Sequence, residues 1–405
     1  MKHAVLRPAN HRKRLLAAGT VLAVLALGLM GMAAPAMAST SCSVTWTGNA
    51  GNGLWSTASN WSTDRVPGPT SNVCIPTLTT ANATPPISVH SIQVGEGASL
   101  LFGSGSVSIA TSLTNQGFIT LTGTALSAAS ITLPSPGNIT TYGNSSITSP
   151  AFSNTSTVSV GTGTLRLADD PVQLQNGTLS GGSWLVSGVL VVPSDISQVT
   201  TQGTVVSIDG TGSAVQDASG NNALATLTTV GPRVALAIDE GASLTVAQGL
   251  TSQGVVDVGT GSAGSLTVSG AYTQASGATT NMSVGTLTAT SVSVQPGSTL
   301  QGNGTVTSSV TNNGNVAPQG SLTVTGNYSQ TASAALTEQF GSTLNVTSNA
   351  TLSGALNVTV NPKHPPQPGA VYTALTFGSL NGSFTSHTAG YTLTTNATNI
   401  QVTKQ

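Results

Sequence analysis

The residues best suited to cleave a polysaccharide lie in one stretch of the chain, between Arg166 and Asp209. Glycoside hydrolysis needs two carboxyl groups that flank one bond, and a lyase needs carboxylates or calcium together with a basic residue. Asp169 and Asp195 are separated by roughly one turn of a repeating fold, which would place them on neighbouring turns. The candidate catalytic residues under this hypothesis are Arg166, Asp169, Asp170, Asp195 and Asp209.

The local pattern favours a structural role for these residues. Neighbouring residues on a strand point to opposite faces, so Asp169 and Asp170 do not converge on one substrate by themselves. This pair and the pair Asp239–Glu240 each precede a proline or a glycine, which is typical of turns. The chain has no G-x-S-x-G, H-E-x-x-H or P-loop motif. The sequence therefore predicts a protein that is not an enzyme and has no metal site and no cofactor.

Residues 1–38 are predicted to be a secretory signal peptide. Five basic residues precede the apolar run Leu15–Ala34, and Ala-Met-Ala stands directly before Ser39. A basic segment, an apolar core and an A-x-A site indicate cleavage after Ala38. The apolar run is also long enough for a transmembrane anchor, but the small-residue site favours cleavage. We expect a secreted protein whose mature chain does not span a membrane.

Loss of the signal peptide would make the mature chain acidic. Five basic residues would remain against eleven acidic ones, which gives a net charge of about −6. Cations so few and so scattered do not form a nucleic-acid footprint. These basic residues are Arg65, Arg166, Arg233, Lys363 and Lys404.

Three of the four tryptophans, Trp46, Trp55 and Trp61, lie between the only two cysteines, Cys42 and Cys74. Two cysteines in an exported chain predict one disulfide, which would close a loop of about 30 residues and contribute about 3 kcal/mol. The tryptophans either form a buried core that caps one end of the fold, or present exposed rings that stack on sugars. Their position beside a disulfide favours the cap, and both roles can hold if one ring faces outward.

Alternating apolar residues predict short β-strands along the rest of the chain. In residues 106–123, Val107, Ile109 and Leu113 fall on alternate positions, with Thr, Asn and Gly between the runs. Alternation over a few residues, broken by Gly and Asn, indicates strands joined by turns. After the signal peptide we find no sustained helical period.

Two sequence templates recur at irregular spacing. The first is SLTNQGFITL (112–121), which returns as GLTSQGVVDV (249–258) and SVTNNGNVAP (309–318). The second is SLTVSGAYTQ (265–274), which returns as SLTVTGNYSQ (321–330). Internal similarity marks a repeat architecture, and the irregular spacing predicts rungs of variable length.

The predicted fold is all-β, a right-handed parallel β-helix (β-solenoid), which we favour over an array of β-sandwiches. Rungs that stack about 4.8 Å apart align equivalent side chains in columns. Columns of like charge would repel, whereas Ser, Thr and Asn can hydrogen-bond, which suits a chain with 5% charged residues. At about 22 residues per rung we expect about twelve rungs. The predicted parts are the signal peptide (1–38), a Trp/Cys cap (39–84), the rungs (85–362) and a C-terminal β cap (363–405).

Each end of the chain carries a recognisable motif. The N-terminal stretch WTGNAGNGLWSTASNWSTDRVPGPTSNVCIP combines Trp-x-Gly, Trp-Ser, Asn-Trp and Val-Pro elements, and the C-terminal stretch PGAVYTALTFGSLNGSFTS contains Gly369, Tyr372, Gly382 and Phe384. In these elements the chain resembles secreted bacterial β-strand-repeat proteins and autotransporter-passenger-like adhesins. These motifs are structural, so the resemblance implies a fold and a cell-surface location without catalytic residues. No outer-membrane barrel is expected to follow.

The expected function is that of an exported structural or adhesive protein at the cell exterior, in contact with polysaccharide or other cell surfaces. The alternative is a β-helix polysaccharide-active enzyme, either a lyase or a glycoside hydrolase. The binding residues expected under the first interpretation are Trp46, Trp55 and Trp61. The ligand, the face that binds it and the self-association of the rods are left open.

Overall fold

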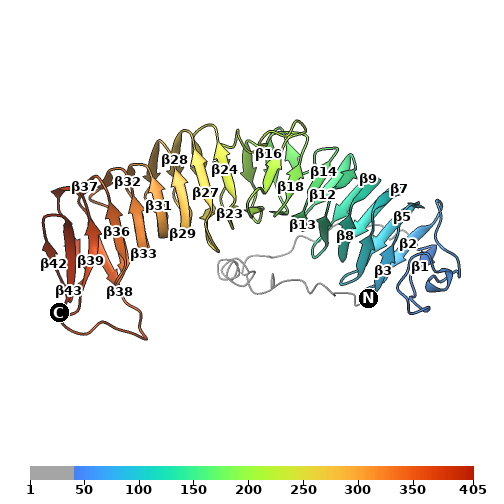
Figure 1. Ribbon diagram of the computed structural model, residues 1–405, viewed down its shortest axis with the longest axis horizontal. Helices are drawn as coiled ribbons and strands as arrows, with labels where there is room; N and C mark the ends of the chain where they lie inside the picture. The colour runs from blue at the N-terminus through green and yellow to red at the C-terminus, as the bar shows by residue number, and fades with distance from the viewer. Residues whose placement is uncertain (1–40) are drawn as a thin grey trace, which may run out of the picture. The chain divides into compact units, whose positions relative to one another are not determined.

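The computed structural model describes residues 41–405, so the predicted signal peptide lies outside the described residues. The described part of the chain contains strands β1 to β43, one short 3₁₀ helix, η1 (Ala58–Asn60), and no α-helix. None of its helices could span a lipid bilayer. Figure 1 shows the strands of the unit Cys42–Gln405 stacked in chain order, from β1 at one end to β42 and β43 at the other.

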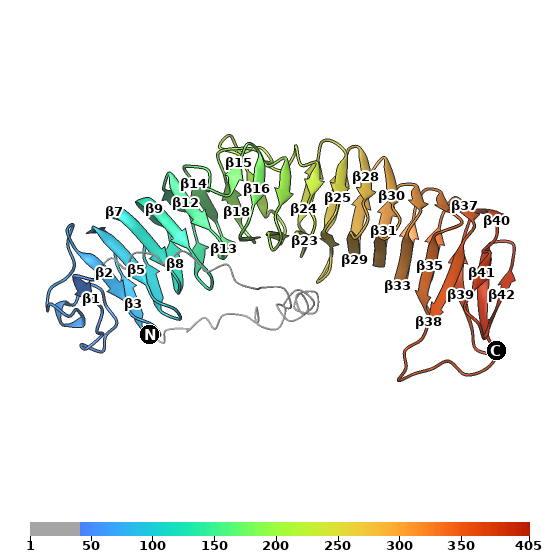
Figure 2. The same ribbon diagram turned by 180° about the vertical axis from the view of Figure 1, so that it is seen from behind.

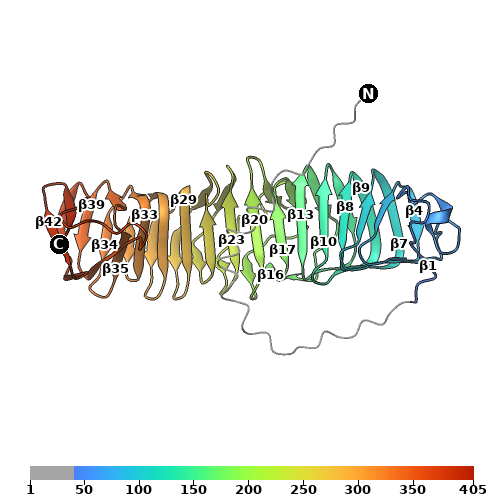
Figure 3. The ribbon, with the colours of Figure 1, turned by 90° about the horizontal axis from the view of Figure 1, so that it is seen from below.

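Each rung contributes strands to three faces, which run along the stack. Face 1 is made by β3 (Thr80–Ala83), β6 (Ser99–Phe102), β8 (Phe118–Thr122), β10 (Asn138–Tyr142), β13 (Thr157–Thr162), β17 (Ser183–Val186), β20 (Val205–Asp209), β23 (Ala235–Asp239), β26 (Val255–Val258), the first parts of β29 (Thr279–Thr288), β31 (Thr299–Thr307) and β33 (Asn315–Val324), and β35 (Ala335–Gln339), β38 (Ala355–Thr359) and β41 (Ser386–His387). Figure 3 shows this face with β8, β10, β13, β17, β20 and β23 side by side.

Face 2 follows face 1 in each rung. It is made by β4 (Ile87–Val89), the first parts of β7 (Gly105–Asn115) and β9 (Thr124–Leu133), β11 (Ser145–Thr148), β14 (Thr164–Leu167), β18 (Val189–Val191), β21 (Ala214–Gln216), β24 (Ser243–Val246), β27 (Ser265–Val268), the second parts of β29, β31 and β33, β36 (Thr343–Val346) and β39 (Val371–Thr376).

Face 3 completes the rung. It is made by β1 (Val44–Thr45), β2 (Asn72–Ile75), β5 (Ser91–Val94), the second parts of β7 and β9, β12 (Ala151–Asn154), β16 (Thr178–Ser180), β19 (Gln198–Thr200), β22 (Thr229–Val230), β25 (Leu250–Ser252), β28 (Ala271–Gln274), β30 (Ser291–Val294), β32 (Val310–Asn312), β34 (Tyr328–Gln330), β37 (Asn349–Leu352) and β40 (Ser379–Gly382). Strand β15 (Leu174–Gln175) pairs antiparallel with β16.

Nearly all pairing between rungs is parallel, which confirms the predicted β-solenoid. The stack has about 14 turns instead of the twelve expected. The ladder is longer because it includes strands outside residues 85–362: β2 pairs with β5, and β37 pairs with β40. Pairing is interrupted between β12 and β16 on face 3 and between β21 and β24 on face 2.

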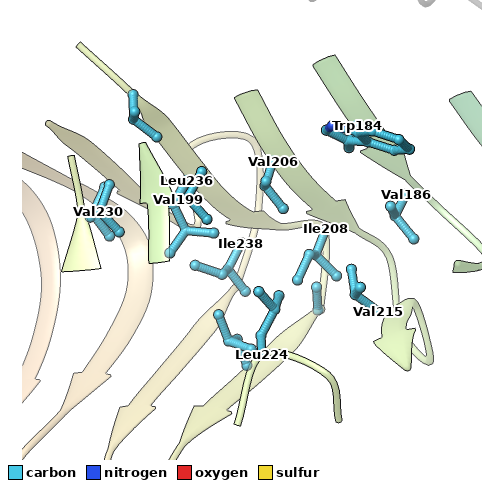
Figure 4. Close-up of a cluster of buried hydrophobic side chains, with 14 of the residues drawn as sticks. Trp184, Val186, Val199, Val206, Ile208, Val215, Leu224, Val230, Leu236 and Ile238 are labelled. Carbon is cyan, nitrogen blue, oxygen red and sulfur yellow. The ribbon is translucent and has the colours of Figure 1, made fainter. Parts of the chain in front are cut away.

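The interior is filled by alternate residues of each strand. In β20 and β23, Val206 stacks on Leu236 and Ile208 on Ile238, because each pair occupies equivalent register positions. Each large apolar side chain contributes about 1.5–3 kcal/mol when buried in this way. Figure 4 shows such side chains from all three faces meeting in the interior: Trp184, Val186, Val199, Val206, Ile208, Val215, Leu224, Val230, Leu236 and Ile238.

The first sequence template corresponds to one corner of the solenoid, where face 3 turns into face 1. Leu113 and Asn115 both point inward and are fully buried. The Asn115 side chain accepts a hydrogen bond from the Gly117 amide (3.0 Å) and donates one to the Asn138 carbonyl of the next rung (2.7 Å). A Cβ on Gly117 would lie 2.4 Å from the Ala98 carbonyl oxygen, so the template requires glycine there. Asn312 and Gly314 repeat this arrangement.

The C-terminal end of the stack is closed by antiparallel strands. Strand β43 (Asn399–Lys404) pairs antiparallel with β39 and with β42 (Tyr391–Thr395). A long loop from Val360 to Ala370 connects β38 to β39 and extends away from the strands (Figure 2). The solenoid therefore ends in a hairpin whose pairing direction differs from that of the rungs.

Candidate binding surfaces

The tryptophan cluster closes the N-terminal end of the stack. Trp46, Trp55 and Trp61 are 2%, 3% and 1% exposed. The Trp61 ring meets the other two edge to face, with centroids 4.9 Å from Trp46 and 4.6 Å from Trp55. Its indole N–H donates to the Trp55 carbonyl at 2.7 Å. Buried rings in this arrangement leave no face free to stack on a sugar, so the cluster is a cap.

A buried amide and a disulfide hold this cap together. Asn60 is fully buried, donates to the Leu54 carbonyl (2.9 Å) and accepts from the Ala50 amide (2.8 Å). Cys42 and Cys74 form the predicted disulfide, with Cα atoms 5.7 Å apart. Together these contacts fix the loops around the tryptophans onto β1 and β2.

The five candidate catalytic residues are spread over different parts of the rung. Arg166 lies on β14 of face 2, whereas Asp209 ends β20 of face 1. Asp169 and Asp170 follow β14, and Asp195 follows β18 one rung later, because β14 pairs with β18. The prediction that Asp169 and Asp195 lie one rung apart is therefore confirmed.

The carboxylate of Asp170 has a structural role at this corner. It accepts hydrogen bonds from the Ser194 hydroxyl (2.5 Å) and the Ser194 amide (3.1 Å) of the next rung. Asp239, at the end of β23, similarly accepts bonds from Thr260, Gly261 and Ser262. Among the described residues, no three His, Cys, Asp or Glu side chains gather where they could hold a metal ion.

An outward column of face 1 carries a chain of amide hydrogen bonds. Asp257, Asn281 and Gln301 occupy equivalent positions on β26, β29 and β31. Asn281 donates to the Asp257 carboxylate (2.6 Å), and Gln301 donates to the Asn281 side-chain oxygen (2.7 Å). Burial raises the pKa of Asp257 despite the Asn281 hydrogen bond. The polar groups of this column therefore bond to one another, which leaves fewer of them free to bind a ligand.

Face 2 carries a longer outward column of hydroxyl and amide groups, which we call the hydroxyl column. It continues over seven successive rungs in the register of β24, β27, β29, β31, β33, β36 and β39. Side chains in such a column repeat about every 4.8 Å. Sequence reasoning found the Thr-rich strands but not their alignment, because the rungs differ in length. Its members are Ser243, Ser265, Thr286, Thr305, Thr323, Asn345 and Thr376.

A hollow of about 410 Å³ lies on face 2 near its corner with face 1. Arg166, Ser146 and Ala125 form one outward column there, on β14, β11 and β9. Asn144 borders the hollow and accepts a hydrogen bond from the Thr164 amide (3.2 Å). The other lining residues are Gly123, Thr124, Ser145 and Thr164. No sequence motif marks this hollow, because its lining comes from three rungs.

The Arg166 guanidinium is exposed on one side of the hollow. It makes no hydrogen bond or ion pair within residues 41–405. Thr124 and Ser145, by contrast, are buried, and the Thr124 amide donates to the Ser145 hydroxyl (3.1 Å). The hollow thus has a fixed floor and one unpaired cation.

Comparisons with known proteins found no matching family model, no matching curated protein and no matching solved structure.

Proposed function

We propose that this chain is an exported structural and adhesive protein that acts at the cell exterior and contacts polysaccharide. The observation that carries the proposal is the hydroxyl column of face 2. Asn345 in this column already bonds to Ser321 (2.7 Å) and Thr376 (2.9 Å), so the available groups are the hydroxyls of the five rungs before it. Hydroxyl groups at a regular spacing can bond in series to a polymer whose own hydroxyl groups repeat. Each contact is weak, but many along one polymer add as multivalent binding.

The build of the solenoid supports a structural role. Its interior is mainly apolar, with a few buried polar side chains, and the N-terminal cap and C-terminal hairpin cover the two ends. Capped ends keep the exposed edges of a repeat protein from pairing with other chains. Such a rod holds the side-chain columns of each face at a fixed geometry.

We further propose that the contact is non-catalytic. Asp170 is engaged by Ser194, and Asp209 lies on a different face from Arg166. Glycoside cleavage requires two carboxyl groups that flank one bond, and Asp170 and Asp209 do not form such a pair. Asp169 and Asp195 follow paired strands one rung apart, so the assay below also tests the alternative of a β-helix lyase or hydrolase.

A depletion assay with insoluble polysaccharides and whole cell walls tests the proposal. The full chain, processed by its expression host, is mixed with each matrix beside the variant Thr305→Val/Thr323→Val. Valine keeps the shape of threonine and removes the hydroxyl. The control variant Thr251→Val/Thr273→Val makes the same change on face 3, at positions paired between β25 and β28.

We expect at least one matrix to deplete the wild type and the control, and to deplete the face 2 variant several-fold less. Equal depletion of all three proteins would move the binding surface away from the hydroxyl column. Depletion by no matrix would refute the adhesive function. A loss of polymer length on incubation would instead favour the enzyme alternative.

A further inference from the structure

We propose that the hollow beside Arg166 binds a polysaccharide that carries carboxylate groups, such as a polymer of uronic acids. This inference rests on the proposed function, since it names one class of polymer and one site on the rod. It concerns face 2 near the N-terminal end, in rungs that precede the hydroxyl column.

Arg166 supplies the recognition of charge. A guanidinium group presents its N–H donors in a planar fork that matches the two oxygens of a carboxylate. The guanidinium of Arg166 is exposed and has no partner in the described part of the chain. By comparison, Arg233 donates to Gln202 at 2.9 Å, and the Lys404 ammonium lies 5.0 Å from the centre of the Tyr391 ring.

The floor of the hollow leaves room for a sugar ring. Arg166 follows Ser146 and Ala125 in one outward column, so the guanidinium side chain stands beside two small side chains. The hollow is open to solvent, and its volume of about 410 Å³ can hold a sugar ring on the surface of the rod. The Ser146 hydroxyl and the Asn144 side-chain N–H₂ have no hydrogen-bond partner among residues 41–405 and can bond to sugar hydroxyls.

An exposed aromatic ring lies on face 1, two residues before Asn144 of the hollow. Tyr142 ends β10 on face 1 and is followed by Gly143 and Asn144, which form the corner. It is 46% exposed, and its ring lies against Gly161 of the next rung, where a Cβ would come within 2.8 Å of it. Aromatic rings with one free face provide a stacking surface for the apolar side of a sugar.

The preference for an acidic polymer comes from Arg166 itself and acts against the net charge of the whole chain. With a net charge of about −6, the mature chain repels a polyanion at long range. The Debye length at physiological salt is about 8 Å, so this repulsion is screened while a direct contact with Arg166 is not. A neutral polymer could accept hydrogen bonds from this guanidinium but would not gain the charge-assisted, two-oxygen pairing that a carboxylate makes.

The test is a calorimetric titration of the full chain with tetragalacturonate, with maltotetraose as the neutral oligosaccharide of equal length. The variants are Arg166→Ala, Arg166→Lys and Tyr142→Ala. Arg65→Ala, in the cap, removes the same charge away from the hollow. Inorganic phosphate is titrated separately, and a circular dichroism melt confirms that each variant is folded.

We expect the wild type and Arg65→Ala to bind tetragalacturonate and not maltotetraose. Arg166→Ala should weaken that binding about tenfold or more, and Arg166→Lys should restore only part of it because the ammonium lacks the fork. Tyr142→Ala should weaken it as well. If Arg65→Ala and Arg166→Ala both lower the affinity to about half that of the wild type, the effect is one of general charge and the proposal is overturned.

Three further outcomes separate this inference from the proposed function. If phosphate binds as tightly as tetragalacturonate does, the hollow is a simple anion site and the inference fails. If maltotetraose binds equally, Arg166 does not select the ligand. If insoluble matrices deplete the protein but tetragalacturonate does not bind, the adhesive function stands and only the assignment of the hollow is wrong.

Discussion

Glu338 is a buried acid inside the solenoid, and its environment makes stability depend on pH. It lies on β35, is fully buried and accepts a hydrogen bond from the Tyr372 hydroxyl at 3.3 Å. Burial raises its pKa well above the usual value of 4.5, and the hydrogen bonds from Tyr372 and the Leu344 amide oppose this shift only in part. One oxygen of its carboxyl group has no partner in the described residues.

We predict that Glu338→Gln stabilises the chain at neutral pH. The folded chain keeps a proton that the unfolded chain releases above about pH 4.5, so the free energy of unfolding falls as the pH rises above that value. The loss amounts to about 1.4 kcal/mol per pH unit until the pKa of the folded state is passed. Urea unfolding followed by circular dichroism, at pH 5 and at pH 8, measures the free energy of unfolding of the wild type and of Glu338→Gln.

The control for this prediction is Glu96→Gln, which changes a carboxyl group outside the interior. We expect Glu338→Gln to reduce the difference in unfolding midpoint between the two pH values, and Glu96→Gln to leave it unchanged. An unaltered difference in Glu338→Gln would mean that this carboxyl group is ionised in the folded protein.

Trp61 is the central ring of the cap, since it contacts both Trp46 and Trp55. We predict that Trp61→Ala costs the cap about 3–5 kcal/mol, as large aromatic-to-alanine changes in a core do. Amide hydrogen exchange should show lost protection in β1 and β2 and native protection from β24 onward, because each rung contacts only its neighbours. Thr63→Ala, on the exposed surface, serves as the control. Uniform loss of protection along the stack would refute the local role of the cap.

The strands could be predicted from the sequence because inward and outward residues alternate within each rung. The cap was also visible, since its tryptophans and cysteines are local in sequence. The hydroxyl column and the hollow could not be predicted, because they depend on which rung positions align, and the rungs differ in length. The burial of Glu338 was hidden for a different reason: alternation from Leu336 places it on the inward side of β35, but an acidic side chain is rarely fully buried and reads as an outward residue.

The corner between faces 1 and 2 depends on a stack of glycines. Gly143 and Gly163 both have positive φ (66° and 82°), and a Cβ on Gly163 would lie 2.6 Å from the Gly143 backbone. Gly203 also has a positive φ of 87°, but a Cβ there would meet no atom within 4 Å. Alanine at Gly203 would therefore cost only the strained backbone conformation, whereas alanine at Gly163 would add a steric clash with the neighbouring rung.

We predict that Gly163→Ala destabilises the chain more than Gly203→Ala does. Alanine in the left-handed region costs about 1–2 kcal/mol, and that is the whole effect expected at Gly203. At Gly163 the neighbouring rung must move as well, which should at least double the loss. Thermal melts of the two variants test this prediction. Equal decreases in melting temperature would show that the corner accommodates the extra methyl group without a further loss of stability.

At the scale of the whole molecule, the rungs should resist proteases better than the loop between β38 and β39. Asn361, Lys363 and His364 in this loop are exposed. We predict that trypsin cuts the folded protein first after Lys363, because exposed loop backbone can enter a protease active site and paired strands cannot. Non-reducing gel electrophoresis follows the cut, since a cut at Arg65 stays joined by the Cys42–Cys74 disulfide.

Lys363→Gln is the matched variant for this experiment and should abolish the first cut. The nicked protein should remain assembled on gel filtration, because β39 and β40 still pair with β36 and β37. Early cutting at Arg166 or Arg233 would contradict the expected resistance of the rungs.

The stacking of rungs in chain order decides how the molecule bears a load. Hydrogen bonds between parallel rungs run along the stack, so a pull on the two ends opposes them directly and frees one rung at a time from an end. A freed rung of about 22 residues lengthens the chain by about 70–80 Å, at some 3.3–3.6 Å per residue. The disulfide keeps the loop from Cys42 to Cys74 from extending. Under tension, the molecule should therefore lengthen in steps of one rung and shorten again as the rungs re-form.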